Sequence, residues 1–369
     1  MTQTPIKTAL IGCGRIAGHH CRSIVATPGV ELAAVCDLKE DKARAYGEEF
    51  GVPWHANYRD MLDGDPGIDM VAVITPSGMH AEHGLEMLRG YGKNLILEKP
   101  TVMRPADLAT IYETADSSGL HVFPVFQNRY NKAVLRVKRA IEAGELGDIR
   151  IMSVRTRWCR PQRYYEMAPW RGTFSHDGGA LTNQGIHHVD LLRHLSGEVT
   201  RVNATMRTLG ADIEVEDTVV ATFVYSGGAV GNLEVTTAAR PDDFEASLSI
   251  VGSKGLAQIG GIAVNELQVF TPDPQACAEH SEDFSDCVYG NGHAAMYRDI
   301  AAHFGGARAY PVERSDALGT IRLLHAFYRS DESGGWVDVD SDHESARLGR
   351  PDDAISDLYR TPRPEDAAQ

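Results

Sequence analysis

The sequence predicts an α/β protein with an N-terminal doubly wound parallel sheet and a C-terminal α+β domain with an open, mostly antiparallel sheet. Three observations support this fold class. Short apolar runs alternate with helical patterns over about the first 125 residues, a glycine-rich turn follows the first run, and strand patterns dominate residues 199–270. Strands of a parallel sheet covered by helices on both faces are almost continuously apolar, as these early runs are.

The first part of the chain repeats a strand–helix rhythm. We expect strands at 8–11, 32–36, 70–74, 95–97 and 121–126. Helical patterns separate them at 16–26, 41–49, 80–88 and 105–118. Proline is tolerated in the first turn of a helix and glycine often ends one, so Pro105 and Gly119 agree with the predicted bounds of the last of these helices.

The rhythm changes after about residue 127. Helices are predicted at 131–143, 186–195 and within 293–330, and residues 157–180 are irregular. Strands are predicted at 149–156, 199–208, 218–225, 229–237, 246–251 and 256–259. The predicted domains are therefore 1–126, 127–338 and a polar tail, 339–369. One face of the second sheet needs a cover, and a subunit of a homodimer or homotetramer is one solution.

Composition and charge exclude several classes of protein. The net charge of −15 argues against binding to nucleic acid, which requires a basic face, whereas a dinucleotide can be held by backbone N–H groups. The six cysteines form no CxxC pair, so we expect free thiols, no metal and a reducing, cytoplasmic location. We find no signal peptide and no apolar run of about 18 residues, which excludes a membrane span.

A glycine-rich turn follows the first predicted strand. It reads Gly12-Cys13-Gly14-Arg15-Ile16-Ala17, the G-x-G-x-x-A pattern of a Rossmann dinucleotide site. Gly12 permits the tight turn and Gly14 lets the backbone approach a pyrophosphate, which would sit at the N-terminus of the helix that begins near Arg15 and Ile16. The alternative is a structural turn that binds no ligand.

Asp37 ends the second predicted strand, 20 residues beyond Ala17. A carboxylate at this position accepts hydrogen bonds from the ribose hydroxyls and repels a 2′-phosphate. The sequence therefore predicts NAD as the cofactor, with NADP less favoured, although the nearby Lys39 weakens this preference.

Three segments resemble the Gfo/Idh/MocA oxidoreductase family. They are residues 75–80 (TPSGMH), 98–100 (EKP, after a strand) and 178–190 (GGALTNQGIHHVD). Further segments resemble the sugar-nucleotide branch that oxidises C3 of UDP-N-acetylglucosaminuronic acid, the WlbA type. They are Arg157-Trp158-Cys159-Arg160, Tyr164-Tyr165, Trp170-Arg171-Gly172, the string from Asn183 to His187 (NQGIH), and Val288-Tyr289-Gly290 with His293. The resemblance implies an NAD(P)-dependent dehydrogenase that acts on CH–OH groups and transfers hydride between a sugar and nicotinamide.

The resemblance also implies catalytic roles. Lys99 would stabilise the developing alkoxide, and His187 would be the general base. Asn183 would orient the substrate or His187; many family members have Asp there, and an Asn cannot relay a proton. The alternatives are a surface lysine, a capping or core histidine and a loop-capping asparagine. Asp190, one turn after His187, could orient it or serve packing.

Further binding residues are implied in the same way. Contacts to the cofactor are expected from Thr75, Pro76, His80, Glu98 and Lys99. Contacts to the substrate are expected from Lys99, Asn183, His187, Arg157, Arg160, Tyr164, Tyr165, Trp170 and Arg171, since guanidinium groups suit carboxylates or diphosphates and aromatic rings suit a sugar or uracil. Surface or core roles are the alternative for each. The rival functions are an inositol or simple-sugar dehydrogenase, a keto-sugar reductase and a non-catalytic dinucleotide sensor.

Overall fold

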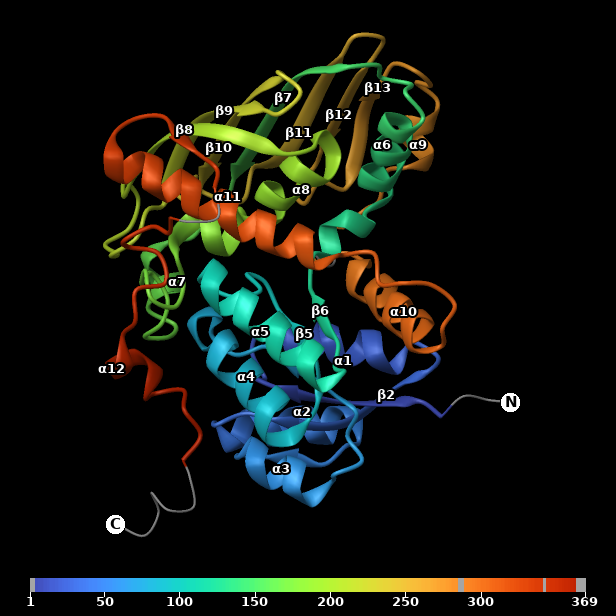
Figure 1. The fold of residues 1–369 in the computed structure, drawn as a ribbon, viewed down its shortest axis with the longest axis vertical. Helices are drawn as coiled ribbons and strands as arrows, with labels where there is room; N and C mark the ends of the chain where they lie inside the picture. Colours follow the sequence, from blue (N-terminus) through green and yellow to red (C-terminus); the bar gives the residue numbers. More distant parts are fainter. Residues whose placement is uncertain (1–3, 285–288, 341–342, 363–369) are drawn as a thin grey trace. The chain divides into compact units, whose positions relative to one another are not determined.

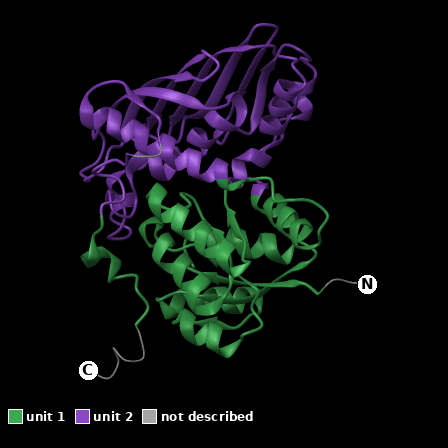
Figure 2. Ribbon diagram, viewed as in Figure 1, with its two compact units in different colours: residues 1–125, 293–314, 351–369 green, residues 126–292, 315–350 purple. Residues whose placement is uncertain are grey.

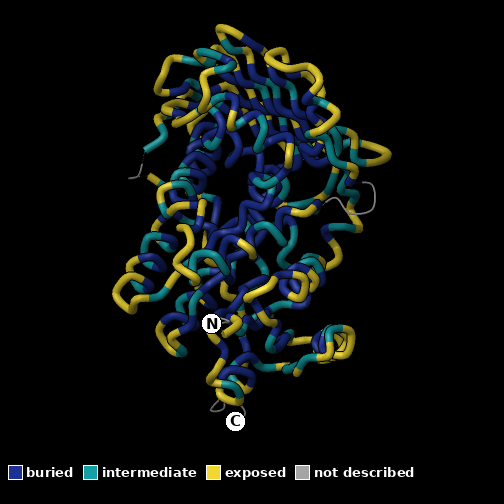
Figure 3. Tube along the Cα trace, turned by 90° about the vertical axis from the view of Figure 1, so that its right-hand side faces the viewer, coloured by how far each residue is buried: buried dark blue, intermediate teal, exposed yellow. Residues whose placement is uncertain are grey.

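The chain forms two compact units that each combine separate stretches of sequence. The structure is a computed structural model, and it describes residues 4–284, 289–340 and 343–362. The first unit comprises residues 1–125, 293–314 and 351–369, and the second comprises 126–292 and 315–350 (Figure 2). Buried and exposed positions alternate along many of the strands and helices, and exposed positions are also frequent in the turns (Figure 3).

The first unit contains a six-stranded parallel sheet in the order β3-β2-β1-β4-β5-β6 (Figure 1). All its neighbouring strands run parallel, and β1, β4 and β5 lie at its buried centre. This order reverses at β1, which places the end of β1 at the switch point where doubly wound sheets bind ligands. The strands are Ile6–Ile11 (β1), Val30–Cys36 (β2), Trp54–His55 (β3), Met70–Val73 (β4), Asn94–Leu97 (β5) and Val122–Pro124 (β6).

Helices connect these strands, and the predicted parallel sheet is confirmed. They are Ala17–Val25 (α1), Glu40–Phe50 (α2), Tyr58–Gly64 (α3), His80–Tyr91 (α4) and Pro105–Ser118 (α5). The sequence reading missed β3 and α3. Strand β3 has only two residues, too few for a periodic pattern. Helix α3 did have a signal in the sequence, because Asn57 caps it by accepting a hydrogen bond from the backbone N–H of Arg59 at 2.8 Å.

A late segment of the chain returns to the first unit. The sequence predicted helical structure within 293–330, and the structure contains two helices there, Gly292–Phe304 (α10) and Arg314–Ser333 (α11). From His293 onward α10 belongs to the first unit, where the Tyr310 hydroxyl that follows it donates to the Pro124 carbonyl at 2.9 Å. Helix α11 belongs almost entirely to the second unit, because the division falls after Arg314.

The second unit contains an eight-stranded mixed sheet in the order β13-β12-β11-β7-β10-β9-β8-β14. Its pairs are antiparallel except for β7 and β10, which run parallel. Together with the first sheet, this confirms the predicted fold class. The strands are Ile149–Arg157 (β7), Val199–Arg207 (β8), Thr218–Tyr225 (β9), Val230–Thr236 (β10), Glu245–Gly252 (β11), Leu256–Gly260 (β12), Glu266–Phe270 (β13) and Val337–Asp338 (β14).

Helices cover one face of this sheet (Figure 1). They include Lys132–Glu142 (α6), Ile186–Ser196 (α8) and α11, and Tyr225 on β9 contacts the Leu192 carbonyl of α8 at 3.3 Å. Residues 343–362, which the sequence placed in a polar tail, include a short helix, Asp353–Ser356 (α12), and Arg360, which forms an ion pair with Glu82 at 2.9 Å. In the described parts of the chain, no helix is long and apolar enough to cross a membrane.

Candidate active site

The glycine turn lies between β1 and α1, at the switch point of the first sheet. Gly12 has φ 104°, and a Cβ there would lie 2.6 Å from the Ile74 carbonyl oxygen, so only glycine fits. A Cβ on Gly14 would meet no atom within 4 Å, which leaves its backbone accessible. Because α1 begins three residues later, this turn fits a dinucleotide pyrophosphate.

Asp37 fixes the glycine turn to the end of β2. Its Oδ2 accepts the backbone N–H of Cys13 at 2.8 Å, and its Oδ1 accepts the backbone N–H of Lys39 at 2.8 Å. Burial, and then the charge of Asp37, raises the pKa of the Cys13 thiol, so this cysteine stays protonated. The Asp37 carboxylate lies beside the turn, where the predicted contact to a ribose requires it.

His80 connects the loop after β4 to the segment after β5. Its ring is buried, with Nε2 2.9 Å from the Thr75 carbonyl and Nδ1 2.9 Å from the Pro100 carbonyl. Burial lowers its pKa. His80 therefore holds two loops together, and its predicted contact with the cofactor, like those of Thr75 and Pro76, stays a prediction.

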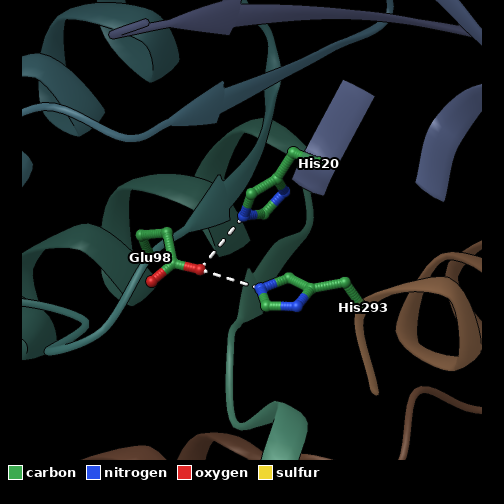
Figure 4. A group of neighbouring side chains, drawn as sticks. All are labelled: His20, Glu98 and His293. Atoms are coloured by element: carbon green, nitrogen blue, oxygen red, sulfur yellow. Dashed lines mark hydrogen bonds and ion pairs between the residues drawn. The ribbon is translucent and has the colours of Figure 1, made fainter. Parts of the chain in front are cut away.

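Glu98 and Lys99 follow β5 directly. The Glu98 carboxylate is buried, and its Oε1 meets His20 and His293 (Figure 4). Its Oε2 accepts the backbone N–H of Lys99 at 2.9 Å. His20, Glu98 and His293 are the one group in the described chain whose His, Cys or carboxylate atoms could jointly hold a metal ion. Sequence spacing did not reveal this group, because its members come from three distant segments.

In the second unit, the signature 178–190 forms a π-helical turn followed by α8. Asn183 lies in the π-helical turn, Ala180–Gln184, and its side-chain amide donates to the Asp177 carboxylate. Asp177 also accepts the backbone N–H of Gly172 at 2.7 Å. Many family members have an Asp where this chain has Asn183. Here a carboxylate is nearby as well, but it belongs to Asp177, six residues earlier, and it contacts the Asn183 side chain.

His187 lies in the first turn of α8. Its side chain is buried, and its Nε2 lies 3.0 Å from the side-chain nitrogen of Gln127. Gln127 stands in a short 3-10 turn after β6, sixty residues away in sequence, and the sequence reading missed it. This amide is therefore one group that orients the His187 ring.

The neighbours of His187 on α8 have structural roles. Asp190 forms a two-pronged ion pair with Arg129, at 2.6 and 2.7 Å. His188 is fully buried, and burial lowers its pKa to about 4. The ion pair favours the packing alternative for Asp190, and His188 is a core residue.

Four of the predicted substrate residues form one cluster in the second unit, which we call the arginine–aromatic cluster: Arg160, Tyr164, Trp170 and Arg171. The Arg171 guanidinium lies 4.3 Å from the centroid of Tyr164 and 4.6 Å from that of Trp170. Arg160 lies over Tyr164 at 5.6 Å and pairs with Asp243 at 2.7 Å. Gln184, three residues before His187, donates to the Tyr164 hydroxyl at 3.0 Å and so joins this cluster to the signature.

Arg157 and Tyr165, which were also predicted to bind substrate, have mainly other partners, although the Tyr165 ring lies edge-on to Tyr164 at 5.2 Å. Arg157 shares the sheet face that points away from α8, and it pairs with Glu234 at 2.6 Å and Glu245 at 3.3 Å. Tyr165 is buried, and its hydroxyl lies 2.9 Å from the Thr237 hydroxyl. Neither side chain is arranged as a ligand group, so a role for them in binding stays a prediction. Val288 lies outside the described residues.

Comparison with known proteins assigns the family. A model of an oxidoreductase family with an NAD-binding Rossmann fold matches residues 6–126, and a model of the GFO/IDH/MocA C-terminal domain matches residues 134–258. The chain belongs to the Gfo/Idh/MocA oxidoreductase family. The predictions of an NAD-binding oxidoreductase and of this family are therefore confirmed.

Three proteins that resemble this chain in sequence or structure are dehydrogenases by name. The WlbA dehydrogenase from Bordetella pertussis, solved with NADH and UDP-GlcNAcA, is 34% identical with a TM-score of 0.86, over 93% of this chain and 100% of that one. The scyllo-inositol 2-dehydrogenase (NAD(+)) of Bacillus subtilis is 26% identical, over 80% of this chain and 90% of that protein. The D-glucoside 3-dehydrogenase of Escherichia coli is 29% identical, over 92% of this chain and 99% of that protein.

Proposed function

We propose that this chain is an NAD-dependent dehydrogenase that oxidises the C3 hydroxyl of a sugar nucleotide carrying a uronic acid. Two similarities support the choice of substrate. The WlbA relative was solved with a UDP-linked acidic sugar, and the D-glucoside relative acts, by its name, at position 3. Together with the residues described above, they favour this reaction over oxidation of a free sugar or an inositol.

One observation within this chain carries the proposal. In the described parts of the chain, no Asp or Glu forms an ion pair with Arg171, whereas Arg160 and Arg157 each have a carboxylate partner. Arg171 is held instead by aromatic rings and by the Tyr164 hydroxyl, to which it donates at 2.5 Å. A half-buried guanidinium with no carboxylate partner is suited to bind an anionic ligand, and a uronic acid or a diphosphate supplies one.

The proposed mechanism gives each residue one task. The turn at Gly12 and Gly14 and the Asp37 carboxylate would hold NAD, which would supply the hydride-acceptor chemistry at the carbon that carries the hydroxyl. His187 takes the hydroxyl proton, and Gln127 keeps its ring in one orientation. Lys99 stabilises the developing alkoxide with its ammonium group, and Asn183, fixed by Asp177, positions the substrate.

The test combines native mass spectrometry with absorbance at the NADH band. We expect the purified protein to bind NAD, and we expect NADH to form with a UDP-linked uronic acid but far more slowly with free sugars. Lys99→Ala should lower turnover by roughly a thousandfold and leave NAD affinity nearly unchanged, because the lost interaction acts on the alkoxide. Lys254→Ala, an exposed lysine in the second unit, is the matched control.

Each other outcome identifies a rival function. Wild-type turnover by Lys99→Ala would refute the mechanism. Faster reaction with an inositol or a free sugar would favour the simple-sugar reading, and reaction only with a keto-sugar and NADH would favour a reductase. Bound NAD with no reaction on the whole panel would favour a dinucleotide sensor.

A cytoplasmic location of this protein stays a prediction.

A further inference from the structure

Glu98 lies at the end of β5 with two histidines directed at one of its oxygens (Figure 4). Oε1 is 3.0 Å from Nε2 of His20 on α1 and 3.2 Å from Nε2 of His293 on α10. The histidines are fully buried, and Glu98 is 4% exposed. These three residues, which we call the His–Glu–His cluster, all belong to the first unit.

The cluster is anchored at both of its ends. Nδ1 of His20 lies 2.8 Å from the Tyr297 hydroxyl, one turn beyond His293 on α10. The second oxygen of Glu98 accepts the backbone N–H of Lys99 at 2.9 Å. A continuous line of contacts therefore runs from α10 through α1 and Glu98 to the backbone of the proposed catalytic lysine.

The cluster holds a buried negative charge, and Lys99 follows Glu98 directly in the chain. Burial alone would protonate Glu98, but hydrogen bonds from His20 and His293 keep its pKa well below the usual range. Burial lowers the pKa of His293, and the charge of Lys99, the residue next to Glu98 in the chain, acts in the same direction. The titratable groups around Glu98 are His20, His293, Tyr297, His80 and Lys99, with His19 stacked edge-on against His293.

Two histidines and a carboxylate are also a possible ligand set for a metal such as zinc. The contacts favour a different reading. Both Nε2 atoms already meet the same carboxylate oxygen at hydrogen-bond distance, and the second oxygen is used by the Lys99 backbone. A metal ion would need these three ligand atoms at once and would replace the hydrogen bonds between them. We therefore treat metal binding as one possible result of the test.

We propose that His20 and His293 are positioning residues that act on Lys99 through Glu98. They hold Glu98 as a carboxylate, one oxygen of which fixes the backbone at Lys99 while its charge stabilises the Lys99 ammonium. The inference rests on the proposed function, in which that ammonium stabilises the alkoxide. It adds an acid and two histidines to the groups on which the reaction depends, without contact between these histidines and the substrate.

The first measurement needs no substrate. Trace acylation of the intact, NAD-loaded protein at a series of pH values, followed by peptide mass spectrometry, gives the pH at which Lys99 becomes half reactive. Glu98→Gln keeps the size of the side chain but removes its charge. We expect the half-point for Lys99 to fall by about one pH unit, because the ammonium loses a neighbouring anion. An unchanged half-point in this variant would overturn the proposal.

A second pair of variants separates charge from packing and applies if Glu98→Gln does not fold. His293→Gln places an amide N–H donor near the position of Nε2, whereas His293→Leu removes the donor. We expect His293→Leu to lower kcat at least about tenfold with little change in KM and to move the Lys99 half-point downward. His293→Gln should restore most of the kcat and most of the Lys99 half-point. The control is His303→Gln, the same change later on α10.

The remaining outcomes are also decisive. If His293→Gln and His293→Leu behave alike, with normal unfolding temperatures, the histidine does not act through its hydrogen bond and the proposal fails. An equimolar metal that is present in the wild type and lost in His293→Leu would replace the proposal with a metal site. If no sugar reacts but the Lys99 half-point moves in Glu98→Gln, the proposed function fails while the electrostatic link stands.

Discussion

Arg171 is the residue whose surroundings say most about the substrate. Its guanidinium is stacked by Tyr164 and Trp170, so it is already oriented before an anion binds. We expect Arg171→Gln to raise KM for a UDP-linked uronic acid by roughly tenfold to a hundredfold, the cost of losing a charge-assisted hydrogen-bonded pair. Steady-state kinetics with acidic and neutral sugar nucleotides measures this.

The pattern across substrates tells which anion Arg171 binds. A KM that rises only for the uronic acid indicates its carboxylate, whereas an equal rise for neutral UDP-sugars indicates the diphosphate. The KM of Arg171→Lys should lie between those of the wild type and Arg171→Gln, because lysine keeps the charge but lacks the planar guanidinium. Unchanged KM values for all substrates in Arg171→Gln would remove the main support for an acidic sugar nucleotide.

Gln127 is the residue that sequence reasoning had no means to find. It belongs to no motif and reaches His187 only through the fold, at 3.0 Å. Gln127→Leu should lower kcat about tenfold to a hundredfold at unchanged NAD affinity, because the His187 ring loses the amide that orients it. Gln258→Leu, on strand β12, is the control. A normal kcat for Gln127→Leu would show that the ring is fixed by other contacts.

The residues that could be predicted share a different property. Gly12, Gly14, Asp37 and Lys99 stand in or beside short motifs that follow a strand, so sequence spacing alone places them at one edge of the sheet. His20, His293 and Asp177 act through partners that are distant in sequence or lie outside any motif, and no local pattern records such contacts.

At the scale of elements, the π-helical turn at Ala180–Gln184 rests on a buried acid. Glu216 accepts the backbone N–H of Leu181 at 3.0 Å and the Tyr328 hydroxyl at 2.8 Å. Gly179 has φ 80°, and a Cβ there would collide with the Glu216 carboxylate. The glycine therefore admits the acid beneath the segment that carries Asn183. The sequence predicted α8 from its periodicity but gave no sign of this irregular turn.

Glu216 makes stability depend on pH. Burial raises its pKa from 4.5 to about 8, so the folded chain keeps a proton that the unfolded chain releases between these values. The free energy of unfolding should therefore fall as pH rises from about 4.5 to about 8 and then level off. Glu216→Gln, which is neutral at every pH, should remove this fall and be more stable than the wild type at pH 8 and above.

Thermal unfolding of both proteins from pH 4 to pH 9 measures the difference. The two curves should meet at the acidic end and separate toward the alkaline end, because only the wild type must bury a group that the unfolded chain would ionise. Glu266→Gln, an exposed acid on strand β13, should show no such separation. A constant difference at all pH values would mean that Glu216 is ionised in the folded protein.

At the scale of the whole molecule, the fold class followed from the rhythm of the chain, but the pairing of distant segments did not. Residues 293–314 have an ordinary helical pattern, and nothing in that pattern says that they join the first unit. Periodicity reports which face of a helix is buried, and it carries no information about the partner that buries it. The division of the chain into 1–126 and 127–338 remains a prediction.

The second sheet carries an apolar row on the face opposite α8. Val230 pairs with Ile151, Ile151 with Val251 and Val251 with Leu256, so the row crosses four neighbouring strands. These side chains are 37% to 49% exposed. A continuous apolar row on an open sheet is a feature of surfaces that bind a partner, and a second copy of the chain is the simplest cover.

We therefore expect a homodimer or homotetramer in solution, measured by light scattering at micromolar concentration. The double variant Ile151→Lys with Val230→Lys should lower the measured mass, because it places two charges at the centre of the apolar row, where burial would cost several kcal/mol. Leu209→Lys is the control, since Leu209 is 71% exposed and lies after β8, outside the row. A monomeric wild type would contradict the prediction. An oligomer unaffected by the double variant would place the interface on another surface.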